Sequence, residues 1–144
     1  MKHPLLEAYI KNNDYGKMIG MDFTVVEDGL IHYTIIIQGK HLATPLAAHG
    51  GLIASLADAA LGVAALSAVC NENKVVSTVE YKISFISPAF SGDELLAIGK
   101  VESKGKRLLI SSCDIFCKND KNRLVAKALG TFNAYPAEKA GYLL

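Results

Sequence analysis

Residues 49–70 read HGGLIASLADAALGVAALSAVC, and this stretch decides the fold. Drawn as a helix, it carries apolar side chains on nearly every side, with Leu52 and Leu56 interleaved with Ile53 and Ala57. The pattern predicts one long helix surrounded by the rest of the protein. Asp58 is the only charged residue in the stretch. An isolated carboxylate in apolar surroundings is costly to bury and often has a functional task.

The stretch opens with His49-Gly50-Gly51, which is a start signal for a helix. The first turn of a helix leaves backbone N–H groups without partners, and its dipole favours negative charge there. The combination of these free donors with Asp58 makes the helix a candidate active site. A membrane span is the alternative, but Ala, Gly and Ser dominate the stretch and Asp58 would lie near the bilayer centre.

Composition narrows the class of protein. A chain of 144 residues suits a single domain, residues 1–144, and 51% hydrophobic beside 20% charged residues predicts a homo-oligomer with apolar interfaces. A net charge of +1 gives no general attraction to nucleic acid or to an anionic membrane. Three cysteines without a Cys-x-x-Cys pair argue against a disulfide framework or a metal site. No signal-peptide core is present near residue 1, which favours the cytoplasm.

The segments before the helix predict a lead-in and a hairpin. Residues 1–19 form a helical lead-in, with a short helix over 5–11 and a break at Asn12-Asn13-Asp14 and Gly16. Strands over 23–27 and 30–37 flank Asp28-Gly29, a strong hairpin signal. A loop over 39–48 leads to the helix.

Four strands are predicted after the helix, followed by a short tail over 136–144. The first alternates strictly, with Ser77, Val79, Tyr81, Ile83 and Phe85 on one face and Thr78, Glu80, Lys82 and Ser84 on the other. Turns at 104–106 and 119–122 join strands over 94–103, 107–118 and 123–135. This order predicts an α+β fold in which an antiparallel sheet curls around the helix, with sheet edges that pair with another subunit.

Four motifs in this order resemble those of a known family. They are Gly20-Met21 with Glu27-Asp28-Gly29, the run from His49 to Asp58, the strand TVEYKISFISP over 78–88, and the turn Lys104-Gly105-Lys106. Together they resemble the hotdog-fold acyl-CoA thioesterases of the phenylacetic-acid-pathway (PaaI-like) type. The resemblance implies a long central helix wrapped by about six curved antiparallel strands. It also implies a homodimer with shared active sites, further paired into a homotetramer, and no cofactor beyond the coenzyme A of the substrate.

The resemblance also implies roles for particular residues. The backbone N–H of Gly50 polarises the thioester carbonyl, Asp58 of the other subunit acts as nucleophile or general base, and Thr78 helps to place the attacking water. Spacing supports the shared site independently. Eight residues separate Gly50 from Asp58, or about 12 Å of helix rise at about 100° per residue. One helix therefore cannot bring both groups to one scissile carbonyl, whereas two antiparallel copies about a two-fold axis can.

Other residues have a structural and a functional interpretation. His49 is expected to cap and orient the helix start, and Gly51 to let substrate approach the N–H donors. His41 is expected to be a solvated loop residue that could line the site. Lys104, Lys106 and Arg107 form a basic turn that is either a solvated hairpin tip or a contact for the coenzyme A phosphates.

Ala43 departs from the family pattern. It stands six residues before His49, where the family commonly has an Asn that places substrate or water, so His41 or Thr44 would have to substitute. Two alternatives to a thioesterase therefore stay open: a catalytically silent protein that binds acyl-CoA or an apolar ligand, and a hotdog hydratase or dehydratase.

Overall fold

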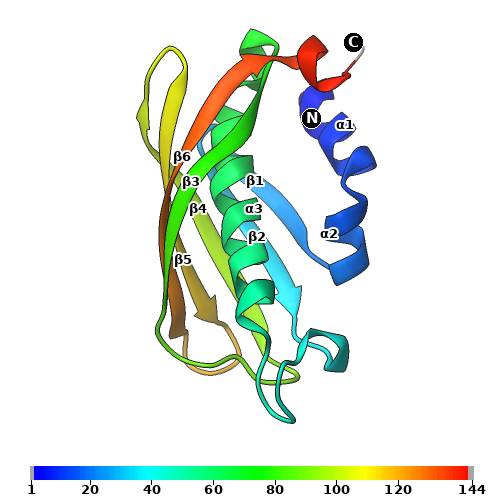
Figure 1. The fold of residues 1–144 in the computed structure, drawn as a ribbon, viewed down its shortest axis with the longest axis vertical. Coiled ribbons are helices and arrows are strands. Elements are labelled where there is room, and N and C mark those ends of the chain that lie inside the picture. Colours follow the sequence, from blue (N-terminus) through cyan, green and yellow to red (C-terminus); the bar gives the residue numbers. More distant parts are fainter. Residues whose placement is uncertain (1, 143–144) are drawn as a thin grey trace.

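A computed structural model describes residues 2–142 and shows one antiparallel sheet curved around a long helix (Figure 1). The six strands lie in the order β1-β2-β4-β5-β6-β3. The predicted hotdog architecture is confirmed. The helices are α1 (Pro4–Asn12), α2 (Asp14–Ile19) and α3 (Gly50–Val69), and the strands are β1 (Asp22–Glu27), β2 (Leu30–Ile36), β3 (Lys74–Phe85), β4 (Glu94–Lys104), β5 (Leu108–Cys117) and β6 (Arg123–Pro136), with short 3-10 turns at Gly39–His41, Cys70–Glu72 and Ala137–Ala140.

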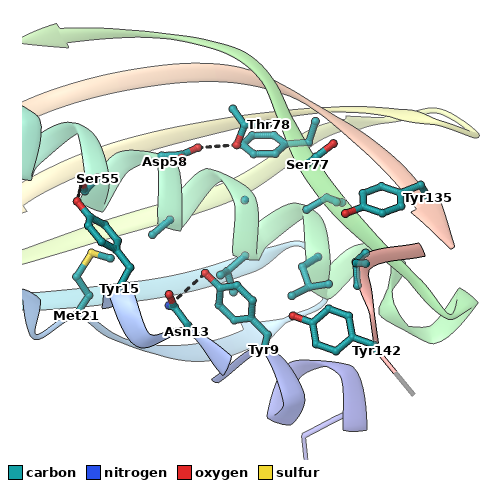
Figure 2. A pocket seen from close by; sticks show the side chains of 18 residues that line it. Tyr9, Asn13, Tyr15, Met21, Ser55, Asp58, Ser77, Thr78, Tyr135 and Tyr142 are labelled. Carbon is teal, nitrogen blue, oxygen red and sulfur yellow. Dashed lines mark hydrogen bonds between the residues drawn. The ribbon is translucent and has the colours of Figure 1, made fainter. Parts of the chain in front are cut away.

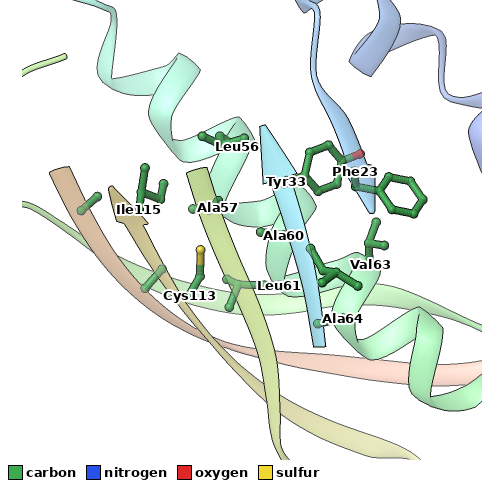
Figure 3. Packing of buried hydrophobic residues seen from close by; sticks show 14 of the residues in the cluster. Phe23, Tyr33, Leu56, Ala57, Ala60, Leu61, Val63, Ala64, Cys113 and Ile115 are labelled. Atoms are coloured by element: carbon green, nitrogen blue, oxygen red, sulfur yellow. The ribbon is translucent and has the colours of Figure 1, made fainter. Parts of the chain in front are cut away.

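Small residues let α3 approach the sheet closely (Figure 3). Ala57, Ala60 and Ala64 are fully buried on the sheet-facing side of the helix. Gly99 of β4 faces the backbone of Ala60 so closely that an added Cβ would overlap the Ala60 carbonyl. Larger side chains such as Leu56 and Ile115 fill the remaining space. The tight helix–sheet contact therefore depends on the Ala-rich composition of the helix.

Two of the predicted turns contain residues with positive φ. Gly29 closes the β1–β2 hairpin with a φ of 83°, a conformation that glycine adopts without strain. Lys121 and Asn122 adopt positive φ between β5 and β6. Register follows from these turns, and Asp22 pairs with Thr34 across the first hairpin.

A β-bulge in β3 corrects the predicted faces of that strand. Thr78 pairs with Phe132 and Glu80 pairs with Thr131, so Val79 is an extra residue without a partner in β6. The bulge reverses the alternation. Thr78 consequently faces α3, and Val79 is 56% exposed, whereas strict alternation predicts that Thr78 shares a face with Glu80.

The lead-in is two helices rather than one helix and a break. Asn13 caps α2, because its side chain accepts a hydrogen bond from the Gly16 N–H at 3.1 Å. The expected break at Gly16 is therefore wrong. Both helices lie on the side of α3 that faces away from β5 (Figure 1). Leu5 and Leu6 anchor α1 in a second apolar cluster beside Leu66.

The long helix is not surrounded on all sides within one chain. Residues on the face opposite the sheet remain partly exposed: Gly51, Ser55, Asp58, Ala59 and Gly62. By length and composition, the segment Gly50–Glu72 could also cross a membrane, but 67% of its most apolar window is buried inside the protein. It is therefore the core helix of the sheet, with one face left open.

Candidate active site

Asp58 and Thr78 form a hydrogen-bonded pair on the open face of α3. The Thr78 hydroxyl donates to Asp58 Oδ1 at 2.8 Å. Asp58 comes from the middle of the helix and Thr78 from the bulged part of β3, so the bulge aims the hydroxyl at the carboxylate. This contact fixes one carboxylate oxygen and leaves the other free to act on a ligand.

The pair faces a pocket of about 390 Å³ (Figure 2). Its far wall is formed by the lead-in together with Ala140 and Tyr142, and Figure 2 shows Tyr9 and Tyr142 opposite α3. Asp58 is the only charged side chain among the described residues that line it. The rest of the lining mixes hydroxyl, amide and apolar groups: Tyr9, Asn13, Tyr15, Met21, Ser55, Ala59, Gly62, Val63, Leu66, Val75, Val76, Ser77, Thr78, Phe132, Tyr135, Ala140 and Tyr142.

Three phenols in or beside the pocket have raised pKa values. Burial raises the pKa of Tyr9, and burial likewise raises the pKa of Tyr142 at the chain end. Tyr81 lies close enough for the charge of Asp58 to add to the effect of burial in raising its pKa. Tyr9 and Tyr142 therefore keep their protons at neutral pH and line the pocket as neutral donors and acceptors.

The helix start presents a single free N–H group. His49 is the N-cap, and its Nδ1 accepts a hydrogen bond from the Gly51 N–H at 2.7 Å. A Cβ at position 51 would come within 2.9 Å of that ring nitrogen, which explains the second glycine. The Gly50 N–H makes no hydrogen bond within residues 2–142. The expected capping role of His49 is confirmed, and Gly50 is left as the candidate oxyanion donor.

Gly50 and Asp58 do not share one site within the chain. Eight helical residues place them about 12 Å apart along the axis and about 80° apart around it. The surroundings differ as well, because Gly50 borders a separate, apolar pocket with Phe85 and Ile86. A thioester bound at both groups requires two copies of the helix.

His41 is a structural residue, not the solvated loop histidine that was expected. It is 4% exposed, and its Nδ1 accepts from the Gln38 N–H at 2.9 Å. Its Nε2–H donates to the Ile19 carbonyl at 2.7 Å, which ties the lead-in to the loop before α3. Both ring nitrogens are thus occupied. Ala43 is exposed in the loop, and its backbone N–H donates to the Ala47 carbonyl.

The basic turn lies at the other end of the helix. The Lys104 ammonium donates to the Ala68 carbonyl at 2.9 Å and to the Glu72 carboxylate at 2.6 Å, so it caps the C-terminal end of α3. These contacts with Lys104 lower the pKa of Glu72. Arg107 donates through Nε to the Asn133 side chain, and Lys106 is exposed. None of these basic residues lines the pocket beside Asp58.

Sequence reasoning missed Tyr15 and Ser55. The Tyr15 hydroxyl lies 2.7 Å from Ser55 Oγ, one turn before Asp58 on α3. Ser55 was visible as a polar residue three positions from Asp58, on the same helix face. Tyr15 had no such signal, because its position depends on how the lead-in folds back over the helix.

Comparisons with known proteins identify the family of the chain. The profile of the thioesterase superfamily matches residues 47–123, more than half of the chain. The acyl-coenzyme A thioesterase PaaI of Escherichia coli is 28% identical over 115 residues, which are 79% of each protein. Human acyl-coenzyme A thioesterase 13 is 23% identical over 113 residues, covering 77% of this chain and 79% of the human protein.

Solved structures resemble most of the chain. The structure of Escherichia coli PaaI superposes with a TM-score of 0.82 at 25% identity and covers 90% of both chains. A Streptococcus mutans protein bound to acetyl-CoA shares the fold, with a TM-score of 0.72 at 24% identity over 81% of this chain and 89% of that one. The predicted family is confirmed, and with it the prediction of a thioesterase-class enzyme. The chain belongs to the thioesterase superfamily and is of the PaaI-like, hotdog-fold type.

Proposed function

We propose that the protein hydrolyses the thioester of an acyl- or aryl-CoA, with Asp58 of one subunit and the Gly50 N–H of the other acting on the same carbonyl. One observation carries the proposal: Thr78 holds Asp58 beside a pocket, while the unpaired Gly50 N–H lies two turns away on the same helix. The similarity to PaaI, a protein named as an acyl-coenzyme A thioesterase, supports the choice of substrate.

The proposed reaction adds water across the C–S bond. The Gly50 N–H donates to the carbonyl oxygen and stabilises the negative charge that develops on it. Asp58 either removes a proton from the attacking water or attacks the carbonyl carbon itself, giving an anhydride that water then opens. The tetrahedral intermediate expels the thiolate of coenzyme A, which takes up a proton. The products are the carboxylic acid and free coenzyme A, and no further cofactor is needed.

The proposed site requires a dimer, and two features of one chain support it. Beside Ser55, which Tyr15 of the lead-in contacts, the open face of α3 bears Gly51, Ala59 and Gly62 around Asp58. Such small residues let a second helix approach closely. Strand β3 lies at an edge of the sheet, so its outer edge is free to pair with the same strand of another subunit. We extend the proposal to a homotetramer of two such dimers. The three buried, free cysteines fit a reducing compartment such as the cytoplasm.

Lys106 and Arg107 remain candidates for the phosphates of coenzyme A. Lys106 is exposed. The hydrogen bond from Arg107 to the Asn133 side chain uses only Nε, so it leaves the two terminal guanidinium nitrogens available for a phosphate. Their turn lies at the end of α3, about 15 Å of helix rise beyond Asp58. Lys104 is a weaker candidate, because the helix end already occupies its ammonium group.

Release of the coenzyme A thiol from a panel of acyl-CoAs tests the function. The native protein should turn over at least part of the panel, and Asp58→Asn should lose about two to four orders of magnitude in kcat. Asn keeps the size of the side chain and can still accept the hydrogen bond from Thr78, so the fold is preserved. Tight binding of acyl-CoA by calorimetry, with no thiol release by the native protein, would instead identify a binding protein. In that case, the loss of hydrolysis would be explained by Ala43, which stands where the family commonly has an Asn.

A further inference from the structure

The lead-in over residues 4–19 forms one wall of the pocket beside Asp58, although it lies outside the segment that the family profile matches. We propose that this pocket receives the acyl group and that Tyr15 sets its width next to the reacting carbonyl. Tyr15 would then be a specificity-determining residue. The inference rests on the proposed thioesterase function and assigns the lead-in a role in it.

The charge of the pocket argues for the acyl group as its occupant. A coenzyme A molecule brings phosphates that need cations, yet no Lys, Arg or His is among the described residues that line this pocket. Asp58 adds a negative charge of its own to the lining. Half of the remaining lining is apolar, from Val63 and Leu66 of α3 to Phe132 of β6. An uncharged acyl group suits these walls, and the phosphates have to lie elsewhere.

Tyr15 reaches α3 at Ser55, one turn from Asp58 (Figure 2). Ser55 donates its hydroxyl hydrogen to the Gly51 carbonyl at 2.9 Å, so the Tyr15 hydroxyl is the donor in the 2.7 Å contact with Ser55. Ser55 and Asp58 are three residues apart and lie on the same face of α3. The phenol ring therefore spans from α2 to the helix face that carries the carboxylate, and it narrows the space between them.

The rest of the lead-in holds this wall in place without Tyr15. Leu5 and Leu6 are buried at its start, and the Tyr9 ring packs against Phe23 with 6.2 Å between centroids. At its end, the Ile19 carbonyl accepts from His41 at 2.7 Å. Tyr15 itself is 54% exposed. Removing its ring should widen the pocket while the two helices stay where they are.

The test compares kcat/KM for acyl-CoAs of increasing bulk, from a short straight chain to branched and aromatic groups. Tyr15→Ala should raise the ratio of bulky to short substrates about tenfold, and Tyr15→Trp should lower it. Tyr15→Phe keeps the ring and should change the ratio by no more than about twofold. Met18→Ala is the matched control, because Met18 lies on the same helix, is 63% exposed and does not line the pocket.

Three outcomes separate the possibilities. Opposite shifts of the ratio in Tyr15→Ala and Tyr15→Trp support the inference, and the second variant serves if the first does not fold. An unchanged ratio, or an equal change of kcat/KM for every acyl group, overturns it. Tyr15 would then contact the pantetheine part of the substrate, or no part of it, and not the acyl group. Absence of turnover by the native protein across the panel would overturn the proposed function itself.

Discussion

Two substitutions on one helix test whether the catalytic groups come from different subunits. Gly50→Pro removes the N–H that is proposed to bind the oxyanion. The local structure accepts proline, because Gly50 is the first helical residue and His49 before it has extended angles, φ −62° and ψ 136°. A Cβ at position 50 meets only the Phe85 ring, at 3.7 Å. Asp58→Asn removes the carboxylate charge and keeps its shape.

The expected magnitudes follow from the separation of the two groups. Gly50→Pro should cost about two to three orders of magnitude in kcat, the effect of losing one oxyanion donor. Asp58→Asn should cost about two to four orders of magnitude. In a mixed dimer of the two variants, one site combines both defects and the other contains neither. The purified mixed dimer should therefore recover about half of the native activity.

Differently tagged subunits, co-expressed and purified through both tags, provide the mixed dimer for the thiol-release assay. The matched control pairs a native subunit with one that carries both substitutions. That dimer has one defect at each shared site and should be almost inactive, whereas a site within one subunit would leave it half active. The reasoning is refuted if the control is half active and the complementing pair is not.

Three further predictions concern the support of the site and the core. Thr78→Val should lower kcat about tenfold by removing the hydrogen bond to Asp58, while Thr78→Ser should retain most of the activity in the same assay. Gly99→Ala should lower the free energy of unfolding in urea by about 1–3 kcal/mol, because the new methyl group overlaps the helix backbone; Gly39→Ala, which meets no atom within 4 Å, is the control and should change it by less than about 0.5 kcal/mol. Burial raises the pKa of Cys113 to about 12, so thiol reagents at pH 8 should label this residue only after unfolding. Between pH 9 and pH 12 the folded protein keeps the proton of Cys113, whereas the unfolded chain loses it. The contribution of Cys113 to the free energy of unfolding should therefore fall as the pH rises from about 9 to about 12, which unfolding measured at several pH values checks.

The architecture could be predicted because its signals are local. Asp28-Gly29 marks a hairpin whose turn needs positive φ, and the structure has that turn at Gly29. The Ala-rich helix and the alternating strands have different hydrophobic periods, so their order was readable. Capping by His49 was also local, since it depends on residues two positions apart.

The face of Thr78 could not be predicted, because strict alternation assumes a regular ladder. One unpaired residue, Val79, shifts the register and turns Thr78 towards the helix. Nothing in the strand's own composition marks the bulge. The lead-in raised the same difficulty, since residues far apart in the sequence place Tyr15 against Ser55. Asp58 was therefore a candidate from the sequence, and the family resemblance placed Thr78 at the same site, but the contact between them depends on the bulge.

The open face of α3 explains why an apolar helix can be both core and active site. Hydropathy showed apolar residues all round, but Ala, Gly and Ser do not reveal whether sheet, lead-in or a second subunit covers them. The structure shows what covers each face: Ala57, Ala60 and Ala64 point to the sheet, and Asp58 lies with Gly62 on the opposite side. That face is partly exposed in one chain and close to a partner in the proposed dimer. The apolar residues of the helix thus serve two contacts, one with the sheet of the same chain and one with the second subunit of the proposed dimer. The Asp58 carboxylate lies at the contact with the second subunit.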